Sequence, residues 1–174
     1  DNVHDMRSYI SQQIHDFHAL MGRGVIAHFD NDSYGEHIWF SRLGEGSLGG
    51  KARGLAFLNN LVYKHKLADK YENVKISIPR TVVIATDYFD QFILENDLQY
   101  VIDSDVSDEE ILSEFVAARL PEKLVEQLRV YVNTAHSPFA VRSSSKLEDS
   151  SYQPFAGVYS TYMIPMVENK DQML

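Results

Sequence analysis

The chain has 174 residues, 44% of them hydrophobic, which is enough to build one domain with a buried core. Its 16 Lys and Arg stand against 25 Asp and Glu, and the net charge of -9 argues against a general binder of nucleic acid or anionic membranes. Zero cysteines exclude disulfides and thiolate metal sites, and no apolar run approaches the roughly 20 residues of a membrane helix. We therefore expect a soluble, cytoplasmic protein.

The first half of the chain predicts two helices followed by extended segments. Apolar residues recur at helical spacing over the first twenty residues, which predicts an amphipathic helix that ends near Gly22. The glycine-rich segment 44–50 leads into a second helix, with apolar residues along one side from Leu55 to Val62. Segments 76–79 and 81–85 are rich in β-branched residues and predict extended structure, the second a buried strand.

The second half predicts three helices and two strands. Thr86 is suited to cap a helix that runs to about Asn96, because its hydroxyl can accept a backbone hydrogen bond. Ser107 has capping-box spacing before a second helix, and Pro121 starts a third. Strands are expected at 139–142 and from 158 to about 164. This order predicts an α+β domain, with a small mixed twisted sheet and helices packed on one side of it.

One candidate for phosphate binding is the lysine turn Gly49-Gly50-Lys51, which places a cation where a predicted helix begins. A P-loop would need Gly six residues before the lysine and Ser or Thr directly after it, and Glu45 and Ala52 occupy those positions. We therefore reject the P-loop. Taken alone, the turn is better explained as a solvated loop before a helix.

A second candidate begins at Arg142, which ends a predicted strand and precedes the three serines 143–145. The guanidinium fork suits phosphate oxygens, and serine hydroxyls donate hydrogen bonds without bulk. An alternative remains open, in which Arg142 only pairs with Glu148 or Asp149. The Ser-x-x-Lys spacing that ends at Lys146 is rejected as a sign of penicillin-recognising enzymes, because their companion motifs are absent.

Together these motifs resemble the N-terminal ATP-binding domain of phosphoenolpyruvate synthases and pyruvate, phosphate dikinases. The matching blocks occur in the family's order: Gly49-Gly50-Lys51 with Leu55, Ile78-Pro79-Arg80 with Ala85-Thr86, Val141-Arg142-Ser143-Ser144, Glu148-Asp149 and Phe155-Ala156-Gly157. The resemblance runs from about residue 44 to 163, and the gap between its last two blocks is its most specific part. It has two departures. Arg80 stands where the family has Gly, and residues 158–160 replace the Gln-Gln-Glu of the synthases.

The resemblance implies an ATP-grasp-like site at which Lys51 and Arg142 bind the phosphates of ATP. The implied ATP contacts are Lys51, Arg142, Ser143, Ser144, Phe155, Ala156 and Gly157, with Arg142 also acting in catalysis. In the family the phosphoryl group passes to a histidine on a later domain and then to pyruvate on a barrel domain. The magnesium (Mg2+) ligands belong to the second half of the ATP site. We expect these parts beyond Leu174, so that this segment alone is inactive.

The resemblance also divides the chain into an N-terminal helical extension, residues 1–43, and a partial ATP-grasp-like domain, residues 44–174. The expected partners are ATP and the later domains of the same chain. Two alternatives stay open: a non-catalytic or regulatory module that keeps the fold, and a related phosphotransferase with another acceptor. No metal site is expected within this segment, because the calcium-loop pattern that starts at Asp30 has Ser41 in place of its final Glu.

Overall fold

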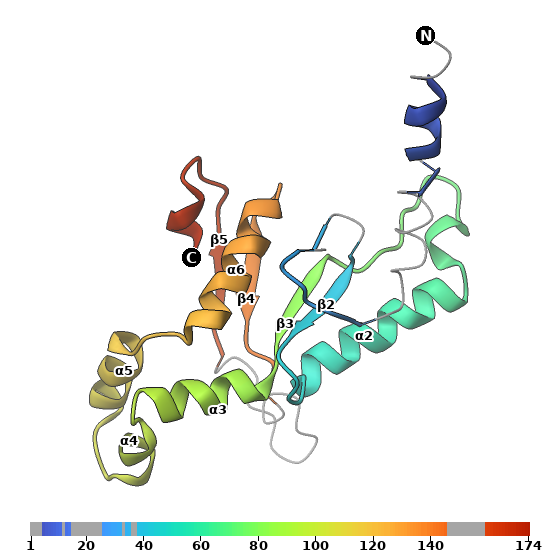
Figure 1. Ribbon diagram of the computed structural model, residues 1–174. Coiled ribbons are helices and arrows are strands. Elements are labelled where there is room, and N and C mark those ends of the chain that lie inside the picture. The colour runs from blue at the N-terminus through green and yellow to red at the C-terminus, as the bar shows by residue number, and fades with distance from the viewer. Residues whose placement is uncertain (1–4, 12, 15–25, 33, 36–37, 146–158) are drawn as a thin grey trace.

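The computed structural model describes residues 5–11, 13–14, 26–32, 34–35, 38–145 and 159–174 (Figure 1). Residues 5–11 and 13–14 are helical, as expected for the start of the N-terminal helix, and they are exposed to solvent. The rest of that predicted helix lies outside the described residues. In Figure 1 these first helical turns stand apart from both sheets, at the upper right.

Three parallel strands form the first sheet: β1 (Ala27–His28), β2 (Phe40–Leu43) and β3 (Thr81–Ile84), in the order β1-β2-β3. β3 confirms the strand predicted after Pro79, although only Val83 in it is buried. Strand β2 pairs with β3 along its whole length, from Phe40 opposite Thr81 to Leu43 opposite Ile84. Strands on both sides of the predicted division between residues 43 and 44 thus share one sheet, and the division itself stays a prediction.

Helices cover both faces of this sheet, whereas the sequence suggested helices on one side only. Helix α2 (Gly49–Lys64) packs on one face, where Phe40, Ala52 and Val83 form a buried cluster. Helices α3 (Thr86–Glu95) and α6 (Glu122–Thr134) pack on the other, where Leu43 meets Tyr88 and Leu124. Side chains alternate along a strand, so that Phe40 and Leu43 of β2 point to opposite faces.

Arg80 ties the segment before β2 to the start of β3. Its Nε donates to the carbonyl oxygen of Ile38 at 3.0 Å, and a terminal nitrogen donates to that of Gly35 at 2.6 Å. The guanidinium carbon lies 4.9 Å from the centre of the Tyr34 ring, within cation–π range. Arg80 is one of the two departures from the resembled family, and the structure gives it a local role that glycine could not fill.

Two short helices, α4 (Gln99–Asp103) and α5 (Asp108–Ala117), follow the end of α3 (Figure 1). Helices α3, α4 and α5 share a cluster around the buried Ile93, Leu98 and Val101. The hydroxyl of Ser107 accepts a hydrogen bond from the Glu110 backbone N–H at 3.3 Å, which confirms the predicted start of α5. Helix α4 was not predicted from the sequence.

The second sheet is an antiparallel pair, β4 (Phe139–Arg142) with β5 (Thr161–Ile164), and β4 has the predicted bounds. The ring of Phe139 meets that of Tyr131 on α6 edge-on, with centroids 5.6 Å apart. The short turn η2 (Lys170–Met173) also reaches α6, through an ion pair of 3.4 Å between Asp171 and Arg129. The α+β class is confirmed, and the described strands form two small sheets, one parallel and one antiparallel, where the sequence predicted one mixed sheet.

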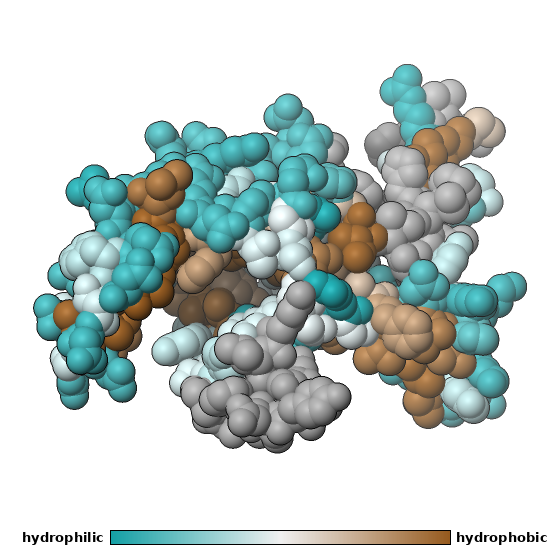
Figure 2. Space-filling view, turned by 90° about the horizontal axis from the view of Figure 1, so that it is seen from below, coloured by the Kyte–Doolittle hydropathy of each residue, from teal (hydrophilic) through white to brown (hydrophobic). Residues whose placement is uncertain are grey.

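Much of α2 beyond its first turns faces solvent. Figure 2 shows hydrophobic surface on the side of α2, at the right, where Phe57 and Leu58 are 64% and 51% exposed. Leu55 packs against the core, so the predicted apolar stripe along α2 is only partly buried. Within the described ranges, no helix combines the length and the hydropathy required to cross a membrane.

Candidate functional site

The glycine-rich segment 44–50 is held by the first residues of α3. The carboxylate of Asp87 accepts a hydrogen bond from the backbone N–H of Glu45 at 2.8 Å and one from that of Gly46 at 3.0 Å. The hydroxyl of Thr86 accepts from the N–H of Ser47 at 2.9 Å. The sequence predicted Thr86 as the cap of α3, and this is wrong: the helix starts after Ala85 without a side-chain cap, because the Thr86 hydroxyl is bound to the loop.

Arg42 at the end of β2 holds the carbonyl side of the same loop. Its Nε donates to the carbonyl oxygen of Gly44 at 2.8 Å, and a terminal nitrogen donates to that of Gly46 at 3.2 Å. Gly44 has a φ of 84°, and a Cβ there would lie 2.4 Å from a carboxylate oxygen of Asp87. The loop is therefore clamped from two sides, and its conformation requires glycine at this position.

Ser144 joins the lysine turn to the arginine segment. Its carbonyl oxygen accepts from the N–H of Gly50 at 3.1 Å. Its hydroxyl accepts from the N–H of Ala52 and donates to the carbonyl oxygen of Leu48, both at 3.0 Å. Gly49 has a φ of 71°, and a Cβ there would lie 1.8 Å from the Ser144 carbonyl oxygen. Two blocks that are 92 residues apart in the sequence thus meet at the start of α2.

Lys51 and Arg142 both lie beside this junction. Lys51 is the third residue of α2, between Gly50 and Ala52, which are the two residues whose N–H groups Ser144 binds. Arg142 ends β4, two residues before Ser144, and is exposed. Strand alternation places it on the face opposite Phe139, which packs on α6. The fold therefore brings the two predicted phosphate-binding blocks together.

The backbone of Arg142 pairs with Thr161 of β5, but its guanidinium makes no hydrogen bond or ion pair within the part of the chain that the structure describes. The alternative partners Glu148 and Asp149 lie outside the described residues, as do the predicted ATP contacts Phe155, Ala156 and Gly157. The predicted contacts Ser143 and Ser144 are both partly buried. The Ser144 hydroxyl bridges the N–H of Ala52 and the carbonyl oxygen of Leu48. In this structure it therefore holds the start of the helix that carries Lys51.

Five backbone N–H groups of this segment are bound within the protein. Those of Glu45 and Gly46 are held by Asp87, that of Ser47 by Thr86, and those of Gly50 and Ala52 by Ser144. A P-loop instead points such groups at the nucleotide. The use of these five N–H groups inside the protein agrees with the rejection of the P-loop from sequence.

The carboxylate of Asp87, which binds the loop from α3, stays charged at neutral pH. Partial burial by itself raises the pKa of Asp87, but hydrogen bonds from backbone N–H groups of the loop and of α3 outweigh it. The pKa of this carboxyl therefore lies below its ordinary value of 3.8. Arg42 and Asp87 were both missed by sequence reasoning. An acidic residue in a first helical turn and an arginine in a strand are common, so neither position carried a distinctive signal.

The described residues contain no group of three or more His, Cys, Asp or Glu side chains that could hold a metal ion. The residues near Lys51 and Arg142 supply cations and hydroxyls, whereas Mg2+ prefers carboxylate and phosphate oxygens. These residues therefore do not fit a magnesium site, and no chemical step is assigned to the metal here.

Residues 45–174 match the family described as pyruvate phosphate dikinase, AMP/ATP-binding domain. The match starts within the glycine loop and includes the lysine turn, Arg142 and Ser144. Comparison with curated proteins and with solved structures gave no match. Because the matched residues make up most of the chain, and because the motif blocks meet in space, the chain belongs to the family of the pyruvate phosphate dikinase AMP/ATP-binding domain.

Proposed function

We propose that Lys51 and Arg142 bind the phosphates of ATP in a dikinase-type phosphotransferase. The observation that carries this proposal is the junction at Ser144, which fixes the start of the lysine helix against the end of the arginine strand. The two cations come from separate parts of the sequence, and one serine fastens both to the same place. A lysine on a turn that was merely solvated would not need this attachment.

In the proposed reaction, a histidine on a later domain of the same chain attacks the phosphoryl phosphorus. The bond to the departing nucleotide oxygen breaks, and its electron pair stays on that oxygen. An enolate oxygen of pyruvate then attacks the phosphorus of the phosphohistidine, and the P–N bond breaks with its electron pair returning to the histidine nitrogen. Lys51 and Arg142 neutralise the charge on the phosphate oxygens during transfer, which is the main way in which proteins accelerate this chemistry.

The two cations have different proposed tasks. Lys51 supplies a compact point charge on a helix whose start is fixed, so it holds the polyphosphate in place. Arg142 supplies a planar fork that can bind two oxygens of one phosphate at once, so it selects geometry as well as charge. Ser143 and the segment 155–157 are proposed to complete the cover over the nucleotide. The ligands of Mg2+ and the rest of an ATP-grasp-like site are proposed to lie outside this segment.

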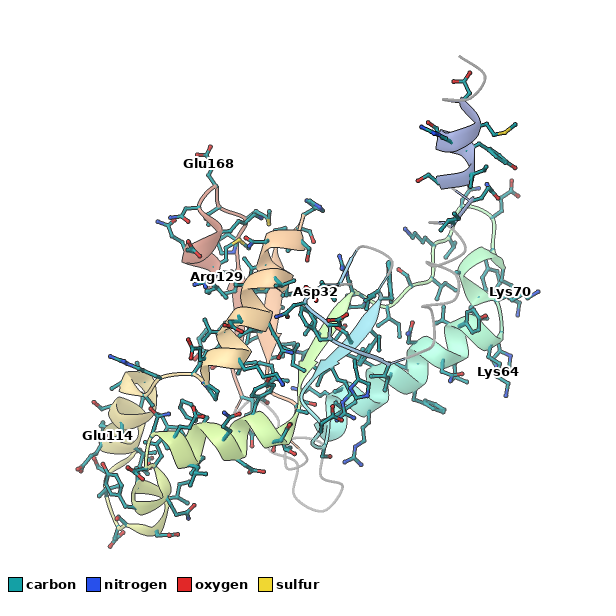
Figure 3. All side chains as sticks on the ribbon, viewed as in Figure 1. Asp32, Lys64, Lys70, Glu114, Arg129 and Glu168 are labelled. Carbon is teal, nitrogen blue, oxygen red and sulfur yellow. The ribbon has the colours of Figure 1, made fainter. Side chains whose placement is uncertain are left out.

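The proposal is tested with Lys51→Ala in the full-length protein, with Lys64→Ala as the matched control. Lys64 is the last residue of the same helix, far from the glycine loop (Figure 3). We expect Lys51→Ala to abolish or strongly reduce both ATP binding by calorimetry and ATP-dependent phosphorylation, and Lys64→Ala to preserve them. Full activity of Lys51→Ala would show that the lysine turn is only a solvated loop. ATP binding without phosphorylation in the unmodified protein would favour the non-catalytic alternative.

A further inference from the structure

We infer that Asp87 is a positioning residue of the ATP site, whose carboxylate serves as an internal anion that fixes the loop of residues 44–47 ahead of Lys51. The inference rests on the proposed function and adds a residue to it. Asp87 lies on α3, a different element from those that carry Lys51 and Arg142. It would act through the loop, without touching the nucleotide.

The contact of Asp87 with the loop is specific on both sides. One carboxylate oxygen binds the N–H of Glu45 and the other binds that of Gly46, so both oxygens are used. A Cβ on Gly46 would lie 2.5 Å from the backbone nitrogen of Asp87, which shows how closely the loop approaches α3. Hydrogen bonds to a charged group are stronger than neutral ones, so this carboxylate is a firm anchor for the loop.

The anchor itself is rigid. Ala85 and Tyr88, on either side of Asp87, are 1% and 5% exposed. The N–H of Ala85 donates to the carbonyl oxygen of Leu43 at 2.9 Å, and the hydroxyl of Tyr88 donates to Gln127 of α6 at 2.7 Å. The start of α3 is therefore built into the core on both sides, so Asp87 transmits a fixed position to the loop.

The loop depends on this anchor because its own sequence is permissive. Only residues 44–48 lie between the buried end of β2 and the start of α2, and two of them are glycines. Glycine loses more conformational freedom on ordering than any other residue. Without the carboxylate, only Arg42 and Thr86 would hold the loop, so it would sample several conformations and only a fraction of molecules would present Lys51 correctly. A binding-competent fraction of about one tenth raises the apparent Kd about tenfold.

The test compares Asp87→Asn with Asp90→Asn in the full-length protein. Asp90 is an exposed carboxylate on the same helix, so its substitution changes the net charge equally without touching the loop. For Asp87→Asn we expect the Kd and the KM for ATP to rise about tenfold. The rate at saturating ATP should stay within about twofold of wild type, because bound ATP stabilises the loop conformation that binds it. Asp90→Asn should change neither. A role in stability alone would lower the melting temperature and leave the KM of the folded protein unchanged.

Hydrogen exchange at the backbone N–H groups of Glu45 and Gly46 reports on the loop directly. It should accelerate in Asp87→Asn and stay unchanged in Asp90→Asn. If Asp87→Asn does not fold, Asp87→Ser, which keeps a hydroxyl acceptor at the helix start, takes its place with the same expectations. An unchanged Kd for ATP in the folded variant would overturn the inference. The ATP site would still stand if Lys51→Ala abolished binding, whereas intact binding in Lys51→Ala would overturn the proposed function itself.

Discussion

Gly49→Ala offers a direct test of the junction at Ser144. Gly49 has a φ of 71°, in the left-handed region, where a residue with a Cβ pays about 1–2 kcal/mol. The new Cβ would also lie 1.8 Å from the Ser144 carbonyl oxygen, so the two segments must separate. Separation weakens the bonds from Ser144 to Gly50, Ala52 and Leu48, each contributing about 0.5–1.5 kcal/mol. If about two of these bonds are lost, the total cost is about 2–5 kcal/mol.

Gly54→Ala provides the matched control, since it makes the same change in the same helix. A Cβ at Gly54 meets no atom within 4 Å. Alanine in a helix interior is about 1 kcal/mol more favourable than glycine, so this variant should be slightly more stable than wild type. Urea unfolding followed by circular dichroism measures both free energies of unfolding. The two variants should therefore shift in opposite directions. A Gly49→Ala variant within about 0.5 kcal/mol of wild type would refute the close contact with Ser144.

Three further predictions concern the charged groups around the sheet. Arg142→Lys in the full-length enzyme should lose about 1.5–3 kcal/mol of transition-state stabilisation, roughly ten- to a hundredfold in rate. The melting temperature should change little. An unaffected rate would argue that this arginine only pairs with carboxylates. Arg80→Gly should lower the free energy of unfolding by about 2–4 kcal/mol, because it removes two hydrogen bonds and the contact with Tyr34, and equal urea midpoints would contradict that role. The lowered pKa of Asp87 stabilises the folded state above pH 3.8, and this contribution disappears as the pH falls through the lower folded value. The stability gap between wild type and Asp87→Asn should thus shrink on acidification, and a gap that stayed constant down to pH 2 would be inconsistent with the shift.

Local sequence patterns predicted the elements that depend on local chemistry. The capping box at Ser107, the proline before α6 and the β-branched run of β3 all appear where expected. Thr86 shows the limit of this reasoning. A threonine at a helix start normally accepts a hydrogen bond from an N–H of its own helix. Here the Thr86 hydroxyl accepts from the N–H of Ser47 in the loop instead. The residues of α3 give no indication that Ser47, 39 residues earlier, would be the partner of Thr86.

The pairing of strands on both sides of residue 43 could not be predicted for a related reason. The resemblance begins near the glycine loop, so the residues before it were assigned to an extension outside the domain. Strand β2 nevertheless lies between β1 and β3, and parallel neighbours are joined only through connections that run over the sheet. Which strand pairs with which depends on the whole chain, and a short segment such as 40–43 carries too little pattern to reveal it.

By itself, the sequence determined the α+β class, most helix and strand positions, and the two cationic motifs that tie the chain to an ATP-binding family. Those features follow from backbone propensity, hydrophobic periodicity and side-chain chemistry, all of which act over a few residues. Only the tertiary structure decided that Ser144 fastens the start of α2, and that Arg42 and Asp87 clamp the loop before Lys51. Each of these contacts joins a side chain to backbone groups on another element. Almost any polar residue can make such a bond, so only the folded geometry selects the one that does.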